Sequence, residues 1–355
     1  MITAFILVLG GGPSGGKYGE YWGARTWYDP GAFQNGFKGF CAVFVTAAFS
    51  FSGTELVGLA AAESENPVKA LPGAIKQVFW RITLFYILGL FFVGLLVPAN
   101  HERLLNVKNK YSDGASPFVI AVSDAGLHGF DHFINTVIMI SVLSIGVSCV
   151  YGGSRTLTAL AQEGYAPKIF TFVDKSGRPL PSVLLFLACG ALAYIQETTG
   201  GAVVFNWFLN LSGLAALFTW GSIILSHIRF RSAWAHHGHT VDEIPFTAAG
   251  GVIGSYIGLA LCLLVLLATL FNAIAPPGQG SDLATAEQFF SAWLTVPVIL
   301  VFWIVGYAWK REGWRTLDQI DVDTGRREHD WESINAHRAV LAAMPAWKRS
   351  LHKVF

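Results

Sequence analysis

Seven long apolar runs occupy most of this 355-residue chain and restrict what it can fold into. A helix needs about 20 apolar residues to cross the roughly 30 Å hydrocarbon core of a bilayer, because its backbone must pair internally there. The fourth run is short and would have to extend toward Pro181 and Thr198 to span. An eighth stretch, Met1 to Leu9, has about half the required length. The sequence therefore predicts seven spans, at residues 37–62, 78–97, 133–151, 182–195, 203–228, 250–275 and 289–308.

The composition indicates lipid as the main surrounding of the chain. Only 13% of its residues are charged and 53% are hydrophobic, whereas ordinary soluble proteins have roughly 25% charged residues. The 24 basic and 23 acidic residues almost cancel, so nothing indicates binding to nucleic acid. We therefore expect an all-α polytopic membrane protein.

The distribution of Lys and Arg predicts the orientation of the chain. Alternate loops carry 18 of these residues on one side, including the C-terminal tail, and 6 on the other. Loops rich in Lys and Arg stay in the cytoplasm. The sequence thus predicts a transmembrane domain at residues 1–309 and a cytoplasmic tail at residues 310–355.

The first long run contains an unusual polar motif at its centre, from Phe49 to Glu55. An ionised carboxylate in the middle of a lipid-facing helix costs several kcal/mol. One interpretation is an interrupted helix whose free ends line a cavity and bind an anionic group. The other is a continuous helix in which Ser and Thr bond back to carbonyls and Glu55 pairs with a neighbour.

Two polar connectors complete the pattern. Residues 63–72 form a turn with two prolines, and residues 154–168 predict a short amphipathic helix that ends at Gly164. Together, FSFSGTELVGLAAAESENPVKALPGAI and SRTLTALAQEGYAPKIF resemble the amino-acid permeases of the amino acid–polyamine–organocation superfamily, in its fungal branch. The tail sequence DVDTGRR at residues 321–327 resembles the same branch, and the similarity covers nearly the whole chain.

The resemblance implies a leucine-transporter-type fold, in which twelve spans form a five-plus-five inverted repeat with two extra helices. On that plan residues 37–62 are the sixth span and Met1 to Leu9 is the end of the fifth. We therefore expect the C-terminal part of this fold, with about seven full transmembrane helices plus a partial one. The first four spans and most of the fifth are expected to be missing.

The resemblance also implies a function, which is proton-coupled amino-acid uptake by alternating access in the plasma membrane. Glu55 matches an acidic residue implicated in gating or proton-linked steps, and Phe49 matches an aromatic that closes over the substrate. The implied partners are the amino acid, protons, the lipid bilayer and other permease subunits, with no cofactor. Which amino acid is carried stays open. The implied substrate-binding residues are Phe49, Ser50, Phe51, Ser52, Gly53 and Thr54.

Two alternatives remain open, namely a non-transporting amino-acid sensor or a regulatory or inactive permease fragment. An enzyme is not expected, because the chain has neither a GxSxG nor an HExxH motif. GGPSGGK at residues 11–17 is followed by Tyr18 instead of the Ser or Thr that a phosphate loop requires. His236, His237 and His239 lack acidic or Cys partners at ligand spacing, so no metal site is expected.

Overall fold

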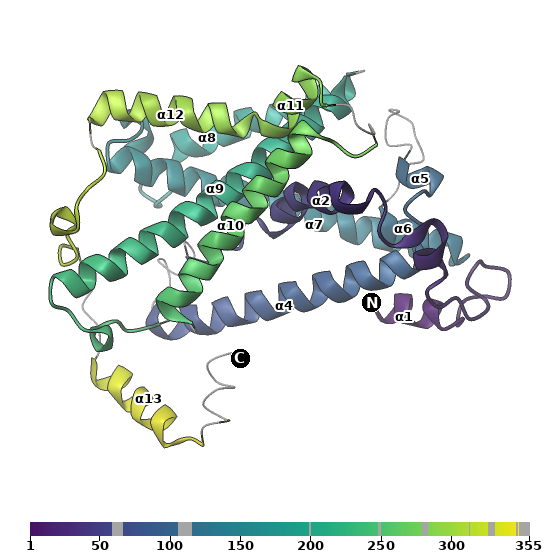
Figure 1. Ribbon diagram of the computed structural model, residues 1–355, viewed down its shortest axis with the longest axis horizontal. Helices are drawn as coiled ribbons and strands as arrows, with labels where there is room; N and C mark the ends of the chain where they lie inside the picture. Colours follow the sequence, from purple (N-terminus) through teal and green to yellow (C-terminus); the bar gives the residue numbers. More distant parts are fainter. Residues whose placement is uncertain are drawn as a thin grey trace. The chain divides into compact units, whose positions relative to one another are not determined.

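The computed structural model describes residues 1–58, 67–105, 116–198, 200–247, 250–278, 283–311, 313–325, 331–345 and 347. Within these residues all regular secondary structure is helical (Figure 1). The α-helices are α1 (Ile2–Val8), α2 (Gly36–Phe51), α4 (Pro67–Leu96), α5 (Glu102–Leu105), α6 (Pro117–Asp124), α7 (Phe130–Gln162), α8 (Leu180–Gly190), α9 (Gly201–His236), α10 (Gly251–Ile274), α11 (Ala286–Trp293), α12 (Thr295–Lys310) and α13 (Trp331–Ala343).

The first six predicted spans overlap helical stretches of membrane length. Six such stretches lie within the described residues, and α11 with α12 makes a seventh if their 59° bend belongs to one span. The short fourth span is lengthened by the 3-10 segment η3 (Ala191–Glu197), which follows α8 directly. The all-helical fold class is therefore confirmed.

The helix predicted at residues 154–168 is helical as far as Gln162, but it continues α7 and is not a short helix by itself. Gly164, with φ of +75°, follows its end as predicted. Small buried residues of α7 pack against α8, where the hydroxyls of Thr158 and Ser182 lie 2.9 Å apart. This packing stabilises α7 beyond the end of the apolar run at Tyr151.

The polar connector at residues 63–72 is shorter than predicted. Residues 59–66 lie outside the described residues, and α4 already begins at Pro67. Pro72 lies inside α4 and not in a turn.

The chain divides into two compact units. The first comprises residues 1–34 and 82–206, and the second comprises residues 35–81 and 207–355. Helices α4 and α9 contribute residues to both units.

In the first unit, the Gly-rich loop after α1 covers the C-terminal end of α4. The last carbonyls of a helix have no partner within the helix. Three loop side chains supply donors: Tyr18 Oη to the carbonyl of Leu96 at 2.9 Å, and Trp22 Nε1 and Thr26 Oγ1 to that of Leu95 at 3.0 and 2.7 Å. Tyr18, which stands where a phosphate loop requires Ser or Thr, thus donates to a helix end.

Charged groups surround this helix end. Lys17 Nζ and His101 Nε2 each lie 3.4 Å from Asp124 Oδ2. Burial, and to a smaller extent the charge of Asp124, raises the pKa of Tyr18 above its ordinary value. The phenol therefore stays protonated and donates to the α4 carbonyl.

In the second unit, helices α2, α9 and α10 pack around a small core of Ala48, Leu214 and Leu217. Helix α9 also bonds to the α11–α12 corner. Asn210 Nδ2 donates to the carbonyl of Ser291 at 3.2 Å, and Thr295 Oγ1 donates to that of Leu211 at 3.0 Å. These two hydrogen bonds hold α9 against α11 and α12.

The outer faces of the helices are strongly apolar. On α12, Phe302 is 73% exposed and Trp303 is 65% exposed. Exposing apolar area to water costs roughly 25 cal/mol per Å², and hydrocarbon removes this cost. The described helices therefore present the surface of an integral membrane protein.

Candidate binding site at an interrupted helix

The polar motif of the first long run interrupts its helix. Helix α2 ends at Phe51, and Ser52 is extended with φ of −60° and ψ of 143°. Gly53 follows with φ of +95°, a conformation that favours glycine. Helical bonds resume when the amide of Leu56 donates to the carbonyl of Gly53 at 3.1 Å. The interruption itself is therefore confirmed, whereas the binding of an anionic group at it stays a prediction.

The carboxylate of Glu55 lies at this interruption. Its Oε2 atom accepts a hydrogen bond from the Gly53 amide at 3.1 Å and one from the indole Nε1 of Trp220 at 3.2 Å. No donor in the described part of the chain reaches Oε1. One oxygen thus connects the interruption to α9.

Helix α9 approaches α2 very closely beside the interruption. A Cβ atom added at Gly213 would lie 2.6 Å from the carbonyl oxygen of Val45 and 3.4 Å from Cβ of Phe49. Leu214, directly after Gly213, and Leu217, one turn further along α9, are buried against Ala48. The last two turns of α2 and the middle of α9 therefore form one packed surface.

The other predicted site residues take different places around the interruption. The ring of Phe49 is 42% exposed. Ser50 Oγ donates to the carbonyl of Thr46 at 2.8 Å, so its proton is used within the helix. Phe51, Gly53 and Thr54 are half-buried, whereas Ser52 is exposed.

Sequence reasoning missed Trp220. It lies 165 positions from Glu55, in an apolar run where a tryptophan is unremarkable. The charge of Glu55 in an apolar run was the signal that a donor must exist, because a half-buried carboxylate needs partners. The sequence contained nothing that identified which residue supplies it.

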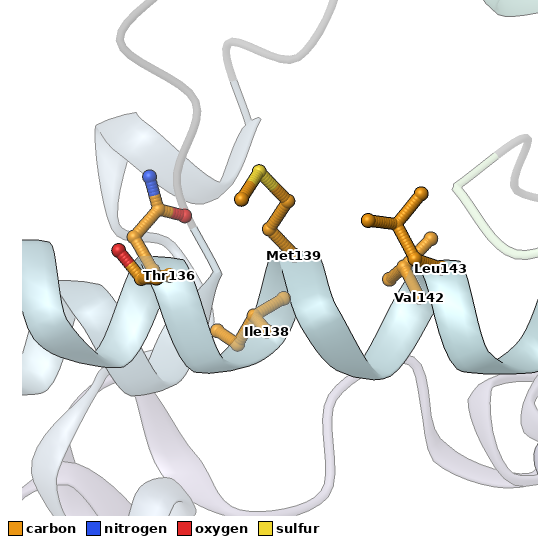
Figure 2. A pocket seen from close by; sticks show the side chains of 6 residues that line it. Thr136, Ile138, Met139, Val142 and Leu143 are labelled. Atoms are coloured by element: carbon orange, nitrogen blue, oxygen red, sulfur yellow. The ribbon is translucent and has the colours of Figure 1, made fainter.

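A hollow lies along α7, in the first unit. It has a volume of about 440 Å³, and Figure 2 shows its labelled side chains standing on one helix. Its lining is apolar apart from Asn135 and Thr136, and Thr136 Oγ1 already donates to the carbonyl of His132 at 2.9 Å. This groove offers little chemistry for a charged ligand.

The histidines near the end of α9 have acidic neighbours that the sequence did not reveal. His236 Nε2 lies 2.5 Å from Asp318 Oδ1, and His239 Nδ1 lies 2.8 Å from Glu243 Oε2. His239 Nε2 also lies 3.3 Å from Asp323 Oδ1. No three such groups in the described ranges are placed to hold a metal ion. The cluster joins the tail to α9.

Comparison with known proteins identifies the family. The family model described as amino acid permease matches residues 1–319. Amino-acid permease inda1 of Hypocrea atroviridis is 65% identical over 355 residues, which are 100% of this chain and 62% of that protein. General amino-acid permease GAP1 of Saccharomyces cerevisiae is 46% identical over 98% of this chain and 58% of its own length.

A more distant relative has a narrower name. The histidine permease of Saccharomyces cerevisiae is 41% identical over 99% of this chain and 59% of its own length. The chain thus spans about three-fifths of the length of these relatives. No solved structure matches it. Since the family model covers most of the sequence and the relatives align along its whole length, the chain belongs to the amino acid permease family.

Proposed function

We propose that this chain serves the transport of amino acids across a membrane, by alternating access and with uptake coupled to the proton gradient. The observation that carries the proposal is the interruption of a membrane-length helix at Ser52 and Gly53. Irregular backbone is tolerated at bilayer depth only where it lines a cavity or packs against protein. The permease names of the relatives support amino acids as the transported class.

The two ends of the interruption suit the two charges of an amino acid. The C-terminal carbonyls of α2 form the negative end of a helix dipole, and the turn that resumes at Leu56 begins with amides at a positive end, where the Gly53 amide donates to Glu55. An ammonium group fits the first end and a carboxylate fits the second. The proposed substrate contacts are Phe49, Ser50, Phe51, Ser52, Gly53 and Thr54.

Glu55 is the proposed gating or proton-linked residue. Its carboxylate accepts a hydrogen bond from the amide of Gly53, which is part of the interruption. A proton gained or lost there changes a hydrogen bond that shapes the backbone at the proposed binding site.

The proposed location is the plasma membrane, with the C-terminal tail in the cytoplasm. The excess of Lys and Arg in the tail and in the loops on its side supports this orientation. Contacts between the tail and the end of α9 support a common side for both segments. Association with other permease subunits is part of the same proposal.

The test is uptake of radiolabelled amino acids by proteoliposomes that contain the 355-residue chain, with an acidic exterior. We expect accumulation that a protonophore abolishes, and loss of that accumulation in Glu55→Gln. Glu287→Gln, an exposed acid in the first turn of α11, is the matched control and should retain uptake. Unchanged uptake and pH dependence in Glu55→Gln would contradict its role. Amino-acid binding without uptake would favour the sensor or regulatory alternative.

A further inference from the structure

Trp220 is a polar contact of Glu55 that no motif indicates. Its indole Nε1 donates to Oε2 of Glu55 at 3.2 Å, and the Gly53 amide donates to the same oxygen at 3.1 Å. Hydrogen bonds to an ionised acceptor are stronger than those to a neutral one. The indole therefore holds the carboxylate at the interruption.

The ring of Trp220 is held in place by packing. It is half-buried against the core of Ala48, Leu214 and Leu217. The close approach at Gly213 keeps this part of α9 against α2. The donor thus has a fixed position from which it can orient the carboxylate.

Protonation of Glu55 changes this contact in a defined way. An indole N–H is a donor only and cannot accept a hydrogen bond from a carboxylic acid. Both observed donors use Oε2, so Oε1 is the oxygen on which a proton fits without a clash. Neutral Glu55 is then a weaker acceptor, and its bond to α9 loosens.

Other titratable groups do not interfere with this contact. The titratable groups within the helices that pack here, besides the charged residues at their ends, are Cys41 on α2, His227 on α9, Tyr256 and Cys262 on α10, Glu287 on α11 and Tyr307 on α12. Within the described residues, none of them contacts Glu55. His227 is instead bonded to Ser255, with Nδ1 and Oγ 2.8 Å apart. The remaining charged residues of α2 and α9 lie toward the helix ends, at Lys38 and from Arg229 onward.

We propose that Trp220 is a positioning residue that couples the protonation of Glu55 to the contact between α9 and the interrupted helix. This inference rests on the proposed function for its physiological meaning. The physical coupling itself requires only the geometry of Trp220, Glu55 and Gly53.

The first experiment is spectroscopic and needs no transport. The 355-residue chain, labelled with ¹⁵N-tryptophan and reconstituted in lipid nanodiscs, gives indole N–H signals from its 12 tryptophans. The signal absent in Trp220→Phe belongs to Trp220. We expect this signal to shift as pH is lowered in the unmodified chain and to stay fixed in Glu55→Gln. A signal that ignores pH, or that titrates equally in Glu55→Gln, overturns the proposal.

The second experiment measures the pH profile of uptake. Trp220→Phe keeps the ring and removes the donor, so the carboxylate is no longer held from α9. We expect the half-maximal pH of uptake to change in this variant. Trp234→Phe is the matched control, because its indole donates to the carbonyl of Thr240 at 2.7 Å, away from Glu55. An unchanged profile in Trp220→Phe, or an equal shift in Trp234→Phe, contradicts the coupling.

The two experiments separate two kinds of failure. If the indole signal follows Glu55 but no variant of the chain accumulates amino acids, the coupling stands and the proposed transport fails. If uptake occurs and the indole signal ignores Glu55, transport stands and the role of Trp220 is overturned. Circular dichroism of Trp220→Phe checks that the helices are retained.

Discussion

At the residue scale, two glycines of the site serve different physical purposes. Gly53 adopts φ of +95°, and a Cβ there would meet only Leu56 Cδ1 at 3.9 Å, so its backbone conformation requires glycine. Gly213 is helical, and there the lack of a side chain allows α9 to touch α2. The first residue makes the interruption, and the second brings Trp220 within reach of it.

Substitution of Gly213 should therefore separate the two helices. In Gly213→Ala the added methyl would lie 2.6 Å from the carbonyl oxygen of Val45, a backbone atom that cannot move aside cheaply. We expect a loss of about 1–3 kcal/mol of stability, typical of overpacking. The measurement is the midpoint of thermal unfolding in nanodiscs, monitored as the decrease of the folded fraction with temperature.

Gly221→Ala is the matched control on the same helix. Nothing lies within 4 Å of a Cβ added at Gly221. Alanine is also the better helix former, by about 1 kcal/mol. The midpoint should stay the same or rise in this variant. Equal decreases in both variants would mean that the close approach at Gly213 does not support the fold.

The sequence predicted one partner of the contact between Glu55 and Trp220 and not the other. Glu55 was found from sequence because a carboxylate in an apolar run needs an explanation. Trp220 was not, since tryptophan is common in membrane helices and its partner is 165 positions away. Pairings between distant helices depend on their packing, which hydropathy does not encode.

At the element scale, the positions of the spans followed from hydropathy, and their ends did not. Each apolar run became a helix because lipid forces the backbone to pair within the segment. The end of α7 was misjudged because contacts with α8, such as Thr158 with Ser182, continue the helix beyond the apolar residues. Tertiary packing decides helix ends that composition leaves ambiguous.

The docked tail is a second element whose contacts the sequence did not predict. The side chains of Trp234 and Val322 are buried together with Ala233. Arg338 of α13 donates to the carbonyls of Asp242 and Ile244 at 2.9 and 2.7 Å. Residues distant in sequence thus hold the segment at residues 317–323 against the end of α9.

Acid should release this tail. Hydrogen bonds from the side chain and amide of Thr324, and from the amide of Asp323, lower the pKa of Asp321 to about 2. A hydrogen bond from His236 lowers the pKa of Asp318 as well. Because the turn at residues 321–324 lowers the pKa of Asp321 and the contact with α9 lowers that of Asp318, the turn and the contact are favoured above about pH 4 and lose this contribution as pH falls toward 2.

Hydrogen exchange of the amides at residues 317–325, corrected for the intrinsic rate, measures the release. We expect protection at pH 5 and its loss between about pH 4 and 2. Asp321→Asn should expose these amides at both pH values, whereas Asp242→Asn on the neighbouring loop should not. Protection that persists unchanged to pH 2 in the unmodified chain would contradict these contacts.

At the scale of the whole molecule, two loop contacts agree with the orientation predicted from charge. In the first unit, Lys17 and His101 meet at Asp124, and all three lie in or beside loops expected outside. In the second unit, the tail meets the loop after α9, and both were expected inside. In each contact the charge distribution assigned both partners to the same side, although the side chains that join them were not predicted.

This orientation gives a prediction for the intact membrane. In a background whose four cysteines are replaced by alanine, Gly15→Cys places a thiol in the loop over α4, and Ser176→Cys places one in the connector before α8. Both positions are exposed, and a Cβ at Gly15 meets nothing within 4 Å. With the orientation set by basic residues, a membrane-impermeant maleimide should label Gly15→Cys in intact cells. It should label Ser176→Cys only after permeabilisation. The reverse pattern would invert the proposed orientation, and it would place the docked tail outside the cell.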